Sequence, residues 1–344
     1  MSPRDRFLAV LAGRDTDKVP FVVWNNKLPG EPVNSRLLDA GACIVNKSTV
    51  YRVETPGVRI EKTPLKPRGG CPRYETVFHT PAGSLTTVER QAPGTVWLEK
   101  MPFAACGDYG PLKALIESRV YTPCYDKFAA DDSMYGDRSI ARPEAIHTPM
   151  QDLICRYMGA EMFCMQWADS RDLVLDLCET IAGDRRRRLD LVASSPAAYA
   201  VVEGNVISGL SAGGMFEKYH VPHIQEACEL LHDKGKFAGA HLDGDNALLA
   251  ETVARTALDL VESFTPPPGC PMTLAQAQRL WPEKTIQVNI PSAIHADGPA
   301  AVGRAVKDLF EGALTLRRLV VGVSEDIPGG GRETLVELAK AVLK

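Results

Sequence analysis

From about residue 138 onward, short apolar runs alternate with amphipathic helical patterns, and this rhythm constrains the fold more than any other feature of the chain. Helical patterns cover residues 222–234 and 247–256, the second opening with Asp245 and Asn246 as candidate caps. The apolar runs cover residues 198–202, 236–240, 258–262, 285–289 and 319–323. Strands that alternate with helices in this way build a parallel sheet. We therefore predict an α/β fold, a (β/α)8 TIM barrel.

The first hundred residues follow two other patterns. Residues 7–13 predict a helical turn, and residues 21–24 predict a first strand, after which Asn25 opens a loop. Residues 51–100 consist of short alternating stretches broken by Pro and Gly, which is typical of antiparallel hairpins. We expect a β-hairpin-rich insertion or cap at residues 51–100 within a single domain that spans residues 1–344.

The charge balance bears on possible partners. The 39 Lys and Arg residues and 43 Asp and Glu residues give a net charge of -4, which indicates neither nucleic acid nor an anionic membrane as a partner. No apolar run reaches the roughly 18 residues of a membrane span. The nine cysteines lack CxxC spacing, so we expect a cytoplasmic protein with reduced cysteines. The expected partner is a small-molecule substrate, and the expected assembly is a homodimer because two-fold association is common.

Polar side chains follow the predicted strands. In a β/α barrel the active site lies at the carboxyl ends of the strands. The polar residues at these positions are Glu203, Asn205, His241, Asp243, Glu262, Asn289, Ser324, Glu325 and Asp326. Carboxylates and an imidazole that converge on one end of a barrel indicate either a metal site or an acid–base site.

His241-Leu242-Asp243-Gly244 is the sharpest of these motifs. Because alternate residues of a strand face the same side, His241 and Asp243 point the same way. An imidazole nitrogen and a carboxylate oxygen suit a divalent ion such as zinc. Glu325 is the candidate third ligand, since the last strand of a closed barrel neighbours the first. In the alternative interpretation, His241 donates to Asp243 or to a backbone carbonyl as a structural pair, and the sequence leaves both open.

Two positions outside the strand ends have a structural and a functional interpretation. His79 lies in a predicted hairpin connection, and it contacts substrate only if it faces the barrel mouth. Trp24 ends the first strand, where an indole either stacks on a planar ligand or packs in the core.

Five segments spread along the chain form a set. They are Arg6-Phe7-Leu8 with Val19-Pro20, Thr80-Pro81-Ala82-Gly83-Ser84-Leu85, Gly235-Lys236 with His241-Leu242-Asp243-Gly244, Glu262-Ser263-Phe264-Thr265-Pro266-Pro267-Pro268, and Gly322-Val323-Ser324-Glu325-Asp326-Ile327-Pro328. Together they resemble the uroporphyrinogen decarboxylase superfamily, nearly from end to end. The His-x-Asp-Gly and Phe-Thr-Pro-Pro-Pro segments are typical of its decarboxylase-like branch, which is related to corrinoid-dependent methyltransferases.

The resemblance implies one of two activities. Decarboxylases of the superfamily hold the carboxylates of a tetrapyrrole with an arginine-rich segment near the N-terminus. Here the corresponding stretch, Trp24-Asn25-Asn26-Lys27-Leu28-Pro29-Gly30, contains no arginine, so bidentate guanidinium recognition is missing from it. The resemblance therefore favours the methyltransferases, which move a methyl group between a corrinoid (cobalamin) protein and an acceptor.

Some of these methyltransferases hold zinc with His-x-Cys and a cysteine of the last strand. In this sequence His241 matches the first ligand, Asp243 replaces the first cysteine, and Ser324 or Glu325 stands at the final position. An oxygen-rich set leaves zinc more Lewis acidic but less suited to activating a thiolate. Zinc-assisted demethylation and an acceptor such as tetrahydrofolate stay open.

The leading prediction is a corrinoid-dependent methyltransferase. Catalysis is assigned to His241, Asp243 and Glu203, and metal binding to His241, Asp243 and Glu325. Substrate binding is assigned to Trp24, Asn25, His79, Asn205, Glu262 and Asn289. One alternative is a cofactor-free decarboxylase of a tetrapyrrole or a smaller aromatic acid, with His241 as proton donor. The other is a non-catalytic barrel that binds a corrinoid or tetrapyrrole for a partner protein.

Overall fold

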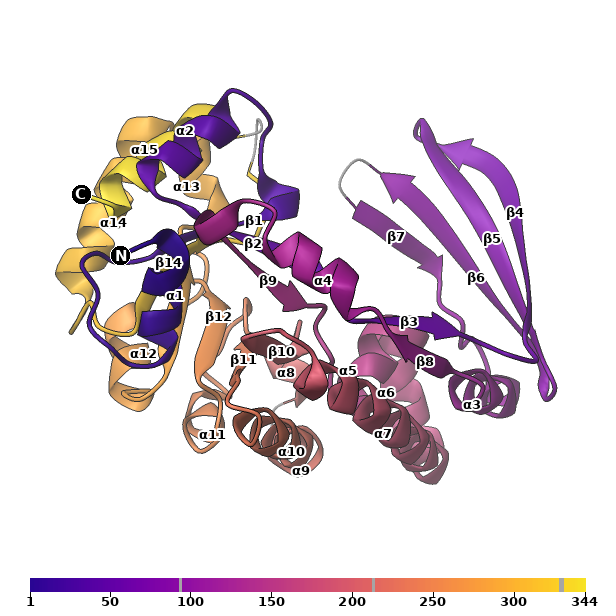
Figure 1. Cartoon of the computed structure of the whole chain (residues 1–344). Helices are drawn as coiled ribbons and strands as arrows, with labels where there is room; N and C mark the ends of the chain where they lie inside the picture. The colour runs from indigo at the N-terminus through magenta and orange to yellow at the C-terminus, as the bar shows by residue number, and fades with distance from the viewer. Residues whose placement is uncertain (93–94, 212–213, 328–330) are drawn as a thin grey trace. The chain divides into compact units, whose positions relative to one another are not determined.

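The computed structural model describes residues 1–92, 95–211, 214–327 and 331–344. These residues form two compact units, whose helices and strands are labelled in Figure 1. The first, called the barrel unit below, comprises Met1–Val50, Cys124–Ile146 and Val192–Lys344. The second unit comprises Tyr51–Pro123 and His147–Leu191.

Eight strands form the sheet of the barrel unit. In spatial order they are β10 (Tyr199–Gly204), β11 (Phe237–His241), β12 (Leu260–Phe264), β13 (Thr285–Asn289), β14 (Leu319–Val323), β1 (Phe21–Trp24), β2 (Cys43–Ser48) and β9 (Ser139–Pro143). All seven neighbouring pairs are parallel. The two outermost strands also meet, because the amide of Ile146, just after β9, donates to the carbonyl of Val201 in β10 at 3.0 Å. The sheet is nearly closed and consistent with the predicted TIM-like barrel.

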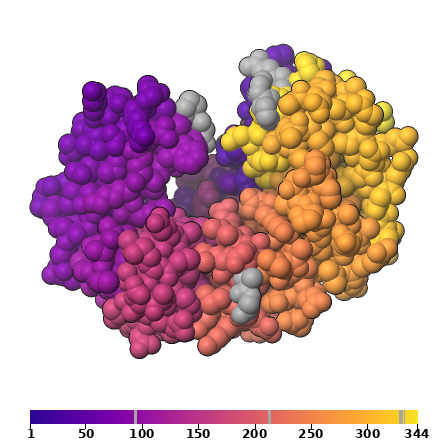
Figure 2. Space-filling view, turned by 180° about the vertical axis from the view of Figure 1, so that it is seen from behind, coloured from indigo at the N-terminus to yellow at the C-terminus, as the bar shows by residue number. Residues whose placement is uncertain are grey.

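Helices surround this sheet (Figure 1). The helices of the barrel unit are α1 (Pro3–Leu11), α2 (Val33–Ala40), α4 (Tyr125–Asp132), α8 (Ser208–Ser211), α9 (Met215–Tyr219), α10 (Val221–His232), α11 (Ala250–Ala254), α12 (Leu274–Leu280), α13 (Ser292–Ala296), α14 (Pro299–Gly312) and α15 (Arg332–Val342). A local sequence signal sets the start of one of these helices. A capping box begins α12, because Thr273 Oγ1 accepts from the Gln276 amide while the Gln276 side chain accepts from the Thr273 amide. In the space-filling view the C-terminal residues of the barrel unit, coloured orange to yellow, form one continuous mass (Figure 2).

Helix α1 packs against the amino-terminal side of the sheet. The rings of Phe7 and Tyr199 contact each other with centroids 5.4 Å apart. Phe7, Val10 and Leu11 belong to one buried cluster that includes residues of six strands. The hydroxyl of Thr285, the first residue of β13, donates to the carbonyl of Val10 at 3.0 Å. Because α1 lies at the starts of the strands, their carboxyl ends are left for a site.

The second unit contains the predicted hairpins. Strands β4 (Arg59–Arg68), β5 (Cys71–Thr80), β6 (Gly83–Ala92) and β7 (Thr95–Lys100) form one antiparallel sheet in that order. A further antiparallel pair joins β3 (Tyr51–Glu54) to β8 (Val120–Pro123). The antiparallel structure therefore extends beyond the predicted 51–100 segment.

The helices of the second unit are α3 (Tyr109–Glu117), α5 (Pro149–Asp152), α6 (Gly159–Asp169) and most of α7 (Arg171–Ser194). A π-helical turn at Leu153–Met158 connects α5 to α6. Within the described residues of both units, no helix is long and apolar enough to cross a membrane.

One prediction of local structure is wrong. The helix expected at residues 247–256 begins only at Ala250, and Asp245 and Asn246 do not cap it. Asp245 Oδ1 instead accepts from the Ala247 amide at 2.9 Å, and the Asn246 side chain donates to the carbonyl of Leu242 at 2.9 Å. Both side chains stabilise the loop that leaves β11, because local side-chain to backbone bonds compete with helix formation.

Candidate active site

His241 lies between two carboxylates at the carboxyl end of β11. Its Nδ1 is 3.1 Å from Oε2 of Glu262, which stands opposite it on β12. Its Nε2 is 3.5 Å from Oδ2 of Asp243. The His241 side chain is 13% exposed and that of Glu262 1%, whereas Asp243 is 49% exposed. The imidazole therefore joins a buried carboxylate to one that faces solvent.

The two carboxylates control the protonation of His241. Burial disfavours the imidazolium, but the hydrogen bonds to Asp243 and Glu262 outweigh burial and raise the pKa of His241 to about 9. Burial would raise the pKa of Glu262, yet the charge of Arg142 and the hydrogen bond from His241 lower it. At neutral pH the site therefore holds an imidazolium between two carboxylates, which is the state of a general acid.

Arg142 of β9 anchors this pair from the interior. Its guanidinium is 3.2 Å from Oε2 of Glu262, with side-chain exposures of 2% and 1%. A buried carboxylate needs such a partner, because an unpaired charge is costly in the interior. Charged groups thus run from Arg142 through Glu262 and His241 to Asp243.

Trp24 forms the floor under the imidazole. The ring centroids of Trp24 and His241 are 5.3 Å apart, with the planes inclined by 35°. Two cations also contact the indole: Lys47 Nζ lies 3.4 Å and the Arg142 guanidinium carbon 5.1 Å from its centroid. Lys47 and Arg142 stand opposite each other on β2 and β9. The indole is buried, and it stacks on side chains of the protein itself.

Glu203 and Asn205 follow β10 but occupy different places. Glu203 is buried and pairs with the equally buried His220, Oε2 to Nδ1 3.1 Å. Asn205 has a positive φ of 55° and lines a cavity of about 360 Å³ together with Asp243, Gly244 and residues 206–208 and 245. A positive φ outside glycine is tolerated best by Asn and Asp. The structure brings Asn205 to Asp243 and places Glu203 with His220.

Asn289, Ser324 and Ser263 form a chain of hydrogen bonds at the carboxyl ends of β13, β14 and β12. The side-chain amide of Asn289 donates to Ser324 Oγ at 2.7 Å, and Ser324 Oγ is 2.6 Å from Ser263 Oγ. Ser263 has a φ of 68° at an irregularity in the pairing of β12 with β13, and such strained positions cluster at functional sites. Asn25, by contrast, lies in a short 3-10 turn, where its Oδ1 accepts from the amide of Asn26 at 3.0 Å.

Among the described residues, no three His, Cys, Asp or Glu side chains lie together as metal ligands. His241 and Asp243 adjoin each other, whereas Glu325 hydrogen bonds to Ser292. Burial raises the pKa of Glu325 above its ordinary value. The three ligands predicted for zinc thus do not lie together among the described residues. Zinc binding stays a prediction.

His79, predicted to bind substrate, lies on β5 of the second unit. Its Nδ1 is 3.0 Å from Ser84 Oγ and its Nε2 is 3.1 Å from Oε2 of Glu61. Both ring nitrogens therefore have partners within the antiparallel sheet.

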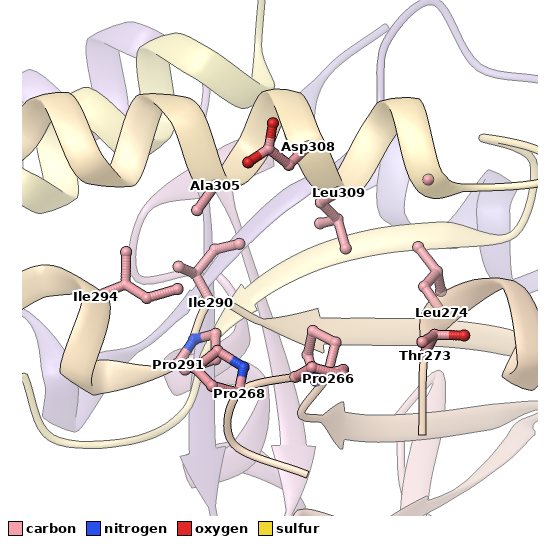
Figure 3. Close-up of a pocket in the computed structure, with 12 residues that line it drawn as sticks. Pro266, Pro268, Thr273, Leu274, Ile290, Pro291, Ile294, Ala305, Asp308 and Leu309 are labelled. Atoms are coloured by element: carbon pink, nitrogen blue, oxygen red, sulfur yellow. The ribbon is translucent and has the colours of Figure 1, made fainter. Parts of the chain in front are cut away.

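An apolar cavity of about 390 Å³ lies outside the site of His241 (Figure 3). It is lined by Pro266–Pro268 of the loop after β12, by Ile290 and Pro291 after β13, and by Leu274, Ile294 and Leu309 of the neighbouring helices. None of the described residues that line it is a histidine, lysine or arginine. The proline-rich loop that leaves β12 thus forms the wall of this cavity, while the charged groups described above lie around His241.

Two candidates for the site were missed in the sequence, Lys47 and Arg142. They come from strands β2 and β9, which the apolar pattern did not reveal. A lone lysine or arginine inside a short apolar stretch was the available signal.

Comparison with protein-family models and with the sequences of curated proteins finds no match for the chain.

Proposed function

We propose that the protein is a methyltransferase that removes the methyl group of a small methylated compound and passes it to a corrinoid acceptor. His241 would donate its proton to the heteroatom of the donor as the methyl group leaves. The observation that supports this role is the imidazolium held between Glu262 and Asp243 at the carboxyl ends of the strands. The sequence resemblance described above supports the methyl group as the group transferred.

The chemistry balances with one proton. The bond between the methyl carbon and the donor heteroatom breaks, a bond between that carbon and the nucleophilic acceptor forms, and the proton of His241 Nε2 moves to the heteroatom. Glu262 fixes the ring by accepting at Nδ1, and Arg142 keeps Glu262 ionised. Asp243, the exposed carboxylate, returns a proton from solvent to Nε2.

A cofactor-free decarboxylase of a tetrapyrrole or smaller aromatic acid is the second candidate. The same imidazolium favours it, because its proton can go to the carbon from which carbon dioxide leaves. Lys47 beside Trp24 adds positive charge that suits an acid substrate. The two candidates share the proton donor and differ in the bond that breaks.

The test incubates the protein with reduced cobalamin and a panel of O-, N- and S-methylated compounds, and follows methylcobalamin by its absorbance. We expect methylcobalamin from at least one donor, and a rate about 10²- to 10⁴-fold lower in His241→Asn. The same panel in acid form, without cobalamin, is tested for carbon dioxide release. Carbon dioxide without methylcobalamin would replace the first candidate by the second.

Elemental analysis of protein purified without chelator runs beside the assay. Stoichiometric zinc that is lost in His241→Ala would add a metal to the site. The absence of methylcobalamin and of carbon dioxide across the whole panel would count against both candidates.

A further inference from the structure

Lys47 lies at the carboxyl end of β2 and forms no direct ion pair with the described residues. Its ammonium lies 3.4 Å above the indole of Trp24, and its side chain is only partly exposed. Within the part of the chain that the structure describes, no carboxylate lies within 4 Å of Nζ and no group hydrogen bonds to it. Among the nearby cations, Arg142 is bound to Glu262, and Lys27 is bound to Asp326 at 2.7 Å.

The charged groups near Lys47 are paired with partners other than Lys47. Arg142 and Glu262 balance each other, and the imidazolium of His241 is balanced by Asp243. The remaining charged neighbours of Lys47 are Glu144, whose side chain is exposed, and Lys27. A partly buried ammonium that forms no direct ion pair with a described residue can bind an anion, because charge-assisted hydrogen bonds are about twice as strong as neutral ones.

Lys47 and His241 share one aromatic floor. Lys47 Nζ and the imidazole centroid lie 3.4 Å and 5.3 Å from the indole centroid of Trp24, so they are at most about 8.7 Å apart and one small molecule can reach both groups. We propose that Lys47 binds a carboxylate of the substrate and so orients the bond that His241 protonates. The substrate class is then a small methylated carboxylic acid. This inference rests on the proposed function for the reaction, but the binding of the carboxylate is testable without turnover.

The protonation of Lys47 supplies a pH signature. Burial, and then the charge of Arg142, lower the pKa of Lys47 to about 8, while Glu144 and Glu262 act in the opposite direction. An anion bound by the ammonium is released as pH rises through this value. An ordinary exposed lysine would hold the anion to a much higher pH.

The test measures binding of benzoate and acetate by calorimetry at pH 7, with benzamide and acetamide as uncharged analogues. We expect the carboxylates to bind the wild-type protein, and Lys47→Met to weaken them about 10- to 100-fold. The control Lys307→Met removes the same charge from the exposed face of α14 and leaves affinity unchanged. Amide affinity should be equal in all three proteins.

Two results would overturn the proposal: wild-type protein that binds neither carboxylate, or Lys47→Met protein that binds them as tightly as wild type. If Lys47→Met does not fold, the benzoate affinity of His241→Asn between pH 7 and 9.5 decides, because His241 itself titrates near 9. A flat profile in this variant would count against Lys47. Failure of the proposed function looks different, because carboxylates then bind through Lys47 while no methyl group is transferred. Conversely, the protein can transfer methyl groups with the same KM in wild type and Lys47→Met. That result would reject carboxylate binding by Lys47 but leave the proposed reaction standing.

Discussion

His241 shows both what a single sequence reveals about a residue and what it conceals. Alternation along one strand placed His241 and Asp243 on the same side, and the structure has them 3.5 Å apart. The partner at the other ring nitrogen, Glu262, belongs to the next strand and was expected to bind substrate. Pairing across strands depends on register, which periodicity within a strand does not contain.

Glu262→Gln tests the buried part of this arrangement. The change leaves the Arg142 charge buried without its counter-ion, so we expect a loss of about 3–5 kcal/mol in the free energy of unfolding. Asp243→Asn is the matched control, since its carboxylate is half exposed and a surface pair contributes about 1 kcal/mol or less. Urea denaturation measures both, and equal losses in the two variants would contradict the account.

At the scale of elements, three strands begin and end where the sequence predicts them: β1, β13 and β14. All three are buried along their length, and β1 and β14 are apolar or small throughout, as buried parallel strands require. Strands β2 and β9 escaped prediction because Lys47 and Arg142 interrupt their apolar runs. Those interruptions are the side chains that meet on Trp24, so the pattern failed where the site is built.

Gly322 on β14 faces Gln287 of the adjacent strand. A Cβ at Gly322 would lie 2.6–2.8 Å from three atoms of the Gln287 side chain, closer than any contact allows. We expect Gly322→Ala to lower the free energy of unfolding by about 1–3 kcal/mol, because side chains in the packed sheet must shift. A thermal melt measures this, and an unchanged melting temperature would show that Gln287 moves aside freely.

At Gly183 in helix α7 we expect the same substitution, glycine to alanine, to stabilise the protein. Gly183 is exposed, lies in the helix interior, and a Cβ there would meet no atom of the described chain within 4 Å. Gly183→Ala should raise the free energy of unfolding of the second unit by about 0.5–1 kcal/mol, since alanine loses less backbone entropy. Hydrogen exchange of the α7 amides detects the change, and faster exchange in the variant would refute it.

For the whole molecule, the sequence rhythm predicted the parallel sheet but not the second compact unit. That unit combines residues 51–123 with residues 147–191, and the two segments are separated by a strand and a helix of the barrel unit. A pattern followed along the chain treats them as unrelated. Their association depends on contacts between distant residues, which local periodicity does not encode.

The pH dependence of stability is a property of the whole molecule. The pKa of His241 rises from 6.5 to about 9 on folding, so its contribution is complete below about pH 6.5 and is lost as pH rises through 9. Burial of Lys47 acts in the opposite direction, since a lowered pKa favours folding at higher pH. The informative quantity is therefore the difference in the free energy of unfolding between wild type and His241→Asn. It should shrink between pH 7 and 10, and a constant difference would contradict the assignment.

The proposed proton transfer depends on an imidazolium at His241, and NMR titration of the ring nitrogens measures this protonation state. The account predicts a pKa near 9 in the wild-type protein, with Nδ1 hydrogen bonded, and a value closer to 6.5 in Glu262→Gln. A wild-type pKa near 6.5, or one that Glu262→Gln leaves unchanged, would contradict it.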